Sequence, residues 1–175
     1  MLIGRLQRGF TLIELLITIV IVAILAALAF PSFKVMLANA QIRTAAQSLH
    51  DGLQLARVEA IRRNERVVFA KDADSGWTVS VNSGGAVVQA RLSSEGSKAA
   101  VVAVTPQAAT KVTFNALGRV VANTDSSSSI TQFDVDVPTT VIPAAQSQEL
   151  RITITAGGAI RLCDPNVAAG VGRGC

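Results

Sequence analysis

Apolar residues are concentrated in the first part of the chain. Of the 21 residues from 10 to 30, 18 are hydrophobic, and only Thr11, Glu14 and Thr18 interrupt the run. A helix of this length measures about 30 Å at 1.5 Å per residue, which is about the hydrocarbon thickness of a bilayer. We therefore predict that residues 10–30 form a transmembrane helix segment.

After Pro31 the apolar residues recur at spacings of three and four, which is typical of an amphipathic helix. The apolar stripe consists of Ile42, Ala46, Leu49, Leu53, Ala56 and Ala60. The pattern predicts one helix from about Thr11 to Asn64. Residues 31–65 would form its amphipathic half, outside the membrane.

From residue 66 onward the pattern changes to the period of two that indicates β-strands. The expected strands are residues 66–70, 76–81, 86–90, 111–114, 119–121, 130–137, 150–156 and 159–163. Gly157 and Gly158 are expected to form a two-residue hairpin turn. The fold class is therefore α+β, with a long N-terminal helix packed on antiparallel β-sheets. One of the sheets is expected to cover the apolar stripe.

Charge adds information on topology. The chain has 16 Lys and Arg against 12 Asp and Glu, and Arg5 and Arg8 precede the apolar run. The positive-inside rule places that end in the cytoplasm, so the rest of the chain would be exported. From residue 31 onward the balance is only 14 to 11, which does not by itself indicate a nucleic-acid partner. A chain that is 50% hydrophobic is also not intrinsically disordered.

Glu14 is the exception within the apolar run. A carboxylate in a membrane segment costs about 2.5–3.5 kcal/mol on insertion scales, so its default interpretation is functional. The run is longer than the apolar stretch of a secretory signal peptide, and no small-residue cleavage site follows it. A plain membrane anchor remains the alternative.

The residues around Glu14 carry a family resemblance. Gly9-Phe10-Thr11-Leu12-Ile13-Glu14 resembles the class III leader junction of type IV pilins and type II secretion pseudopilins. The resemblance implies a leader peptide at residues 1–9, which prepilin peptidase would cut between Gly9 and Phe10 before methylating Phe10. It also implies a helix kink at Pro31 and a pilin-like fold. The protein would cross the inner membrane once, with a periplasmic C-terminal domain, before assembly with other pilin subunits.

In this family, Glu14 becomes the fifth residue of the mature chain. We hypothesise that its carboxylate pairs with the freed amino group of Phe10 in a neighbouring subunit. Such a pair offsets the desolvation cost only when the subunits are correctly staggered, so Glu14 would set the assembly register.

Residues 49–64 narrow the resemblance to one group. This stretch, LHDGLQLARVEAIRRN, is similar to the helix of the GspH and FimT/FimU group of minor pilins and pseudopilins. The resemblance implies a non-enzymatic structural subunit of a type IV pilus or a type II secretion pseudopilus. Such a subunit would help to initiate assembly or lie near the tip, and residues 66–175 would form its β-rich globular domain.

Cys163 and Cys175 are the two cysteines of the chain. In an exported domain they would meet an oxidising compartment, where disulfides persist. A disulfide between them would close a C-terminal loop, and two unpaired thiols are the alternative. Many pilin-like proteins end in such a loop, which favours the pilus branch of the family.

No catalytic constellation emerges from the sequence, and we expect no enzyme activity, cofactor or metal. His50 is the single histidine and lies on the predicted helix. Asp134 and Asp136 share one face of a predicted strand, which favours a solvated face over acid–base chemistry. Asp72 and Asp74 lack the glycine spacing of a calcium loop.

DNA binding is the alternative function. FimT-type pilins are linked to DNA uptake in natural transformation through a Gly-Arg-x-Arg motif near the carboxyl end. The matching stretch here is Gly158-Ala159-Ile160-Arg161, in which Ala159 replaces the first arginine. Arg151, Arg161 and Arg173 are the candidate DNA-binding residues, since three cations could contact phosphates. The domain has no tyrosine to contribute to an aromatic stacking platform.

Overall fold

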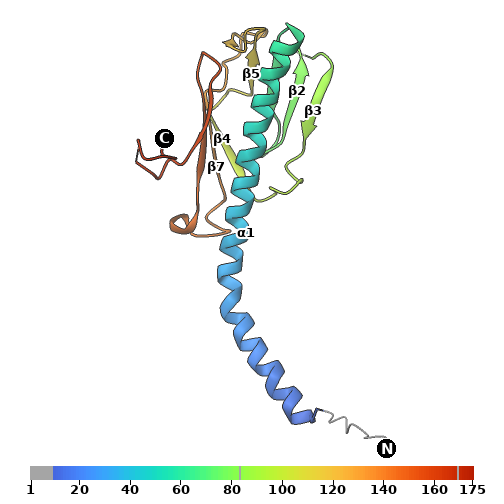
Figure 1. The fold of residues 1–175 in the computed structure, drawn as a ribbon, viewed down its shortest axis with the longest axis vertical. Coiled ribbons are helices and arrows are strands. Elements are labelled where there is room, and N and C mark those ends of the chain that lie inside the picture. The colour runs from blue at the N-terminus through green and yellow to red at the C-terminus, as the bar shows by residue number, and fades with distance from the viewer. Residues whose placement is uncertain (1–9, 83, 169) are drawn as a thin grey trace, which may run out of the picture.

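One helix dominates the architecture. The computed structural model describes residues 10–82, 84–168 and 170–175, so the expected leader at residues 1–9 lies outside the described residues. Helix α1 (Leu12–Arg63) runs through both halves that the sequence predicts. Figure 1 shows it leaving the globular part and continuing alone over its N-terminal half.

The ends of α1 follow ordinary capping rules. The Thr11 hydroxyl accepts a hydrogen bond from the Glu14 backbone N–H at 3.3 Å, which satisfies one of the free donors of the first turn. At the other end Asn64 adopts the left-handed conformation, with φ 54°. Pro31 lies inside the helix, where its ring removes one backbone donor. The kink at Pro31 stays a prediction.

The remaining chain forms two sheets whose neighbouring strands pair antiparallel. The larger sheet has the order β3-β2-β1-β5-β6, and the smaller one has the order β4-β7-β8-β9. The larger sheet contains β1 (Val67–Lys71), β2 (Trp77–Val81), β3 (Val87–Arg91), β5 (Lys111–Phe114) and β6 (Val120–Val121). The smaller sheet contains β4 (Val101–Thr105), β7 (Gln132–Asp136), β8 (Leu150–Ile154) and β9 (Ile160–Cys163). A short 3₁₀ helix, η1 (Ala144–Gln146), lies between β7 and β8.

The apolar stripe of α1 packs against both sheets. Ile42, Leu49, Leu53 and Ala60 are fully buried, as the helical periodicity predicts. The helix contacts β1, β2 and β5 of the larger sheet and β7, β8 and β9 of the smaller one. The expectation that a single sheet covers the stripe was therefore too narrow.

Aromatic rings connect the two sheets beneath the helix. Phe69 of β1 stacks on Trp77 of β2 with ring centroids 5.8 Å apart. Phe69 also meets Phe133 of β7 edge to face at 5.9 Å, which is a favoured geometry for aromatic pairs. The Trp77 Nε1–H donates to the Ser48 hydroxyl of α1 at 2.8 Å, so the indole binds the helix as well.

Two details differ from the sequence prediction. Strand β4 was not expected, because Val101 and Ala103 are apolar yet exposed, so polarity does not alternate along it. The turn between β8 and β9 is longer than two residues. Thr155 N–H donates to the Ala159 carbonyl, which leaves residues 156–158 as a three-residue turn. Gly158 takes the left-handed position there, with φ 82°.

Candidate functional site: the apolar half of α1 and the disulfide loop

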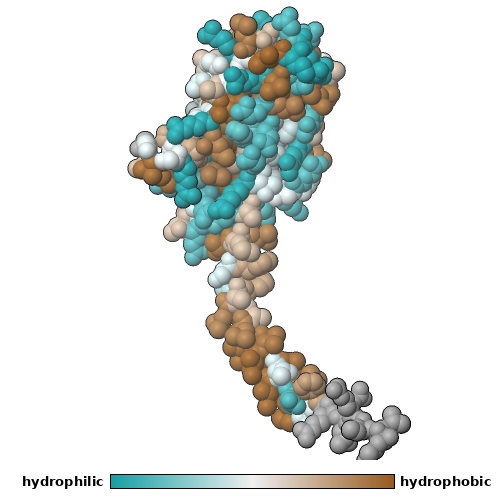
Figure 2. Space-filling model, viewed as in Figure 1, coloured by the Kyte–Doolittle hydropathy of each residue, from teal (hydrophilic) through white to brown (hydrophobic). Residues whose placement is uncertain are grey.

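The N-terminal half of α1 is an unusually apolar exposed surface. Its large hydrophobic side chains, from Leu12 to Phe30, are 48–81% exposed. Figure 2 shows this hydrophobic colouring over the part of the helix that leaves the globular half. By length and composition α1 can cross a membrane. In lipid such a surface is stable, whereas in water it would be a severe aggregation liability.

Glu14 lies in the first turn of this apolar half. Its backbone N–H is held by Thr11, and its side chain is exposed. A carboxylate also suits a helix N-terminus, where the helix dipole favours negative charge. Phe10 is 84% exposed. Gly9, on the other side of the expected cleavage site, lies outside the described residues. The pairing of Glu14 with a neighbouring Phe10 stays a prediction.

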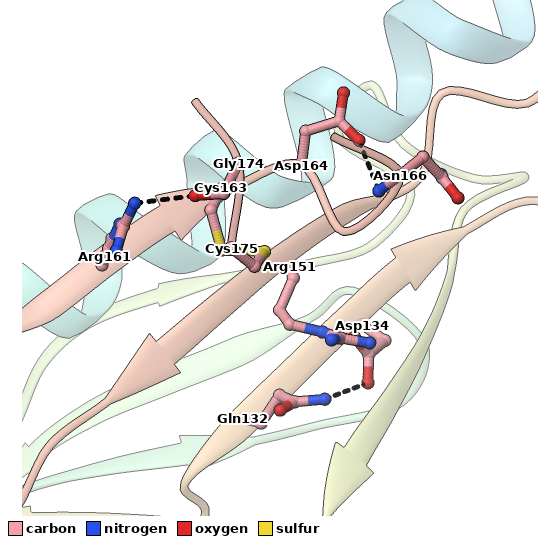
Figure 3. Close-up of a disulfide and its surroundings, with 9 residues drawn as sticks. All are labelled: Gln132, Asp134, Arg151, Arg161, Cys163, Asp164, Asn166, Gly174 and Cys175. Carbon is pink, nitrogen blue, oxygen red and sulfur yellow. Dashed lines mark hydrogen bonds and ion pairs between the residues drawn. A yellow bond between two sulfur atoms is a disulfide. The ribbon is translucent and has the colours of Figure 1, made fainter. Parts of the chain in front are cut away.

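The C-terminal segment is closed by a disulfide between Cys163 and Cys175, whose Cα atoms lie 5.1 Å apart (Figure 3). Backbone hydrogen bonds hold the same segment, because Asp164 N–H donates to the Arg173 carbonyl at 2.7 Å. The Asp164 carboxylate accepts from the Asn166 N–H at 2.9 Å. We call residues 163–175 the disulfide loop.

The three candidate DNA-binding arginines have different surroundings. Arg151 pairs with the Asp134 carboxylate at 2.6 Å. Arg161 donates to the Gly174 carbonyl at 2.7 Å and so helps to hold the disulfide loop (Figure 3). Arg173 is exposed on that loop. Two of the three guanidinium groups therefore already have a protein partner.

Acidic groups surround Arg151. Glu149 is half-buried, and its pKa is raised first by burial and then by the nearby charges of Asp134 and Asp136. The Asp136 carboxylate accepts from the Ser147 hydroxyl and from the Val137 N–H. Negative charge next to Arg151 weakens this face of the sheet as a phosphate-binding surface.

A groove of about 490 Å³ separates α1 from the disulfide loop. Arg43 of α1 and Arg173 of the loop line it, above Leu150 and Leu162. Arg43 also donates to the Gln148 side chain. Arg43 was not among the residues expected at a site, because its place on the polar face of the helix gives no sign of the loop that folds back toward it.

The remaining polar candidates have structural surroundings. His50 is half-buried, with Nδ1 3.5 Å from the Asp51 carboxylate. Asp72 accepts a hydrogen bond from Thr78 at 2.7 Å. Within residues 10–82, 84–168 and 170–175, no group of three His, Cys, Asp or Glu side chains could hold a metal ion.

The fold and the composition of α1 agree with comparisons to known proteins. The family model described as type II transport protein GspH matches residues 45–165, more than half of the chain. The chain belongs to the GspH family. In this GspH-family protein, residues 4–30 also match the model of the prokaryotic N-terminal methylation motif.

Relatives of this GspH-family protein include pilus proteins. A fimbrial protein of Moraxella nonliquefaciens is 45% identical over 69 residues, which is 39% of this chain and 43% of that protein. The type IV major fimbrial protein FimA of Dichelobacter nodosus is 43% identical over 60 residues, which is 34% of this chain and 37% of FimA. The chain thus spans less than half the length of these relatives.

A solved structure shows the same fold. The type IV minor pilin FimU of Pseudomonas aeruginosa superposes with a TM-score of 0.52 at 18% identity, over 73% of this chain and 97% of that one. The long helix on antiparallel sheets is therefore a pilin-like fold. Together with the family match and the fimbrial relatives, it supports a structural, pilin-type role.

Proposed function

We propose that this GspH-family protein is a non-enzymatic structural subunit, a minor pilin or pseudopilin of a type IV pilus or a type II secretion pseudopilus. Its apolar helix half anchors the subunit in the inner membrane, with the globular domain in the periplasm. Prepilin peptidase removes residues 1–9 and methylates Phe10. The subunit then enters the fibre together with other pilin subunits, near the tip or at the start of assembly.

One observation carries this proposal. A single helix has two different halves: the first exposes its apolar side chains on all sides, and the second buries its stripe beneath two sheets. A surface that is apolar all round is stable only in lipid or among similar helices. Membrane storage followed by packing among neighbouring subunits satisfies both conditions with the same residues.

The mature N-terminus provides the most direct test. Mass spectrometry of the protein purified from membranes is expected to give a chain that begins at Phe10 and carries one additional methyl group. A Gly9→Ala variant is the matched control, because it changes the residue before the cut and leaves α1 intact. If the wild-type protein retains Met1, the pilin proposal is wrong.

Glu14 tests assembly separately from processing. We expect Glu14→Gln to be processed and inserted like the wild-type protein but to enter sheared fibres at strongly reduced levels, because its amide cannot form the ion pair. Immunoblots of fibre and membrane fractions measure both steps. Thr18→Ser, one helical turn further along, is the control. Equal incorporation of Glu14→Gln and wild type would contradict the register hypothesis.

DNA uptake is the weaker alternative. It rests on Arg161 and Arg173, because the neighbouring Arg151 is paired with Asp134, and Arg161 uses one of its donors on the Gly174 carbonyl. A structural role needs no such free cations.

A further inference from the structure

The segment between β7 and β8 differs from the rest of the domain surface. We call residues 137–148 the rim. The rim contains no charged residue, and Asp136 and Glu149 flank it on either side. Pro143, Ala144 and Ala145 are exposed, and Val141 is 44% exposed. Exposing an uncharged, partly apolar stretch of this length to water is unfavourable in free energy, unless a partner surface covers it.

The rim is held firmly to the helix. Asn39 of α1 is only 7% exposed, and its side-chain amide donates to the Gln146 carbonyl at 2.9 Å. The same side chain accepts a hydrogen bond from the Gln148 N–H at 2.9 Å. Ile142 is buried in the core, and the Ser147 hydroxyl donates to Asp136. The exposed surface of the rim is therefore presented in a fixed position relative to α1.

That position is level with the end of the apolar helix half. A groove of about 560 Å³ is lined on one side by Pro31, Ser32 and Asn39 and on the other by Ala145 and Gln146. The rim therefore reaches back along α1 to Pro31, the residue that follows the apolar run. Figure 1 shows the segment between β7 and β8 as the lowest part of the globular half, beside the point where α1 leaves it.

The length of the apolar part of α1 shows where Pro31 and the rim would lie relative to a bilayer. Leu12–Pro31 spans about 30 Å as a helix, which matches the hydrocarbon core. The headgroup region adds roughly 5–7 Å on each side. With the apolar half in the membrane, Pro31 lies at the hydrocarbon boundary, and the rim beside it reaches the headgroup layer. Lys34, whose Nζ lies 4.9 Å from the Phe30 ring centroid, places a cation at the same level.

We propose that the rim lies in the lipid headgroup layer of the membrane that α1 crosses, and that the groove between the rim and Pro31 opens onto lipid headgroups. This inference rests on the membrane anchoring in the proposed function. The absence of charged residues from the rim fits contact with lipid, because no charged side chain has to lose its water when the rim enters the headgroup layer. The Ser32 hydroxyl and the Gln146 side-chain amide at the groove can hydrogen-bond to headgroup oxygens.

The experiment measures the depth of two positions in the full chain. The protein is placed in phosphatidylcholine nanodiscs that contain a lipid with a spin-labelled headgroup, and a fluorophore is attached at Ala145→Cys. The matched control carries the fluorophore at Leu117→Cys, next to Gly118, which packs on Ile61. Ile61 lies about 45 Å further along α1 than Pro31. Mass spectrometry checks that the Cys163–Cys175 disulfide is intact in both.

We expect several-fold stronger quenching at Ala145→Cys than at Leu117→Cys. Equal quenching at the two positions, in discs that hold the inserted chain, overturns this inference and leaves the anchoring proposal standing. A chain that is washed out of the discs by alkaline carbonate overturns the anchoring and this inference together.

A substitution that adds a charge distinguishes a rim that contacts the lipid from a rim that only lies near it. In the Ala145→Cys background, Ala144→Glu places a charge on the rim, whereas Ala144→Gln adds a neutral side chain of the same size. We expect the glutamate to reduce quenching markedly and the glutamine to leave it unchanged, because only the charge must be desolvated in the interface. The same response to both substitutions would show that the rim does not rest on lipid.

Discussion

Gly52 lies where α1 approaches the larger sheet too tightly for a side chain to fit. A Cβ atom at this position would lie 2.8 Å from Trp77 Cε2 and 2.9 Å from Phe69 Cε2. Both rings belong to the aromatic group that joins the two sheets, and neither is a flexible chain end that could move away at low cost. The missing side chain of one helical residue therefore allows α1 to lie directly on the Phe69 and Trp77 rings of the larger sheet.

Gly52→Ala is expected to destabilise the protein. Overpacking of a well-filled core costs about 1–3 kcal/mol, and the better helix propensity of alanine offsets at most about 1 kcal/mol of this. Chemical denaturation of the full chain in detergent, followed by the fluorescence of Trp77, measures the change. Gly157→Ala is the control, because its nearest contact would be Thr155 Oγ1 at 3.8 Å. A Gly52→Ala protein as stable as this control would contradict the close packing.

Sequence patterns predicted the structural role of some residues and not of others, for physical reasons. The stripe from Ile42 to Ala60 was predictable because burial on a helix repeats with a fixed period. Asn39 was not, since its hydrogen bonds reach Gln146 and Gln148, more than 100 residues away. Arg161 was found as a cation, but its bond to the Gly174 carbonyl depends on how the disulfide loop folds back.

At the scale of elements, the helix was easier to predict than the edges of the sheets. α1 ends within one residue of both predicted limits, because Thr11 and Asn64 carry cap signals. β4 lies at one edge of its sheet and leaves apolar residues exposed, so no alternation marks it. The length of the β8–β9 turn depended on which of two adjacent glycines takes a positive φ.

The disulfide loop gives a prediction at this scale. A crosslink between residues 12 apart is worth about 3 kcal/mol in the chain-entropy model. We expect the double variant Cys163→Ser, Cys175→Ser to lose up to about this amount of unfolding free energy. Denaturation with and without reductant measures it. Reductant should destabilise the wild type and leave the double variant unchanged. If the wild type is equally stable when reduced, the disulfide does not contribute to the free energy of unfolding.

At the scale of the whole molecule, the apolar half and the globular half depend on the same helix. The pattern of hydropathy alone predicted both halves and their order. It could not predict that two sheets share the helix, because that arrangement depends on long-range contacts between β7–β9 and α1. The family resemblance at residues 9–14 and 49–64 carried more of the functional prediction than composition did.

Nucleic-acid binding is also a property of the whole surface. Because Arg151 is paired with Asp134 and further acidic groups lie beside it, which leaves two of the three arginines without a charge partner among the described residues, we expect no salt-sensitive gel shift with duplex DNA at concentrations of about 10 µM. Arg161→Ala and Arg173→Ala are the informative variants, and Arg119→Ala, on the β5–β6 turn, is the control. A shift that is present in the wild type and lost only in the first two would instead support the DNA-uptake alternative.

The continuity of α1 has a mechanical consequence. Its 52 residues have a contour length of about 78 Å, and the structure assigns helix to every residue from Leu12 to Arg63, through the bend that Figure 1 shows. The domain and the apolar half therefore belong to one continuous hydrogen-bonded helix. If the apolar half lies in a bilayer, as in the proposed function, a pull on the domain is transmitted along this helix, so that extraction from the bilayer and advance of the subunit would be a single movement.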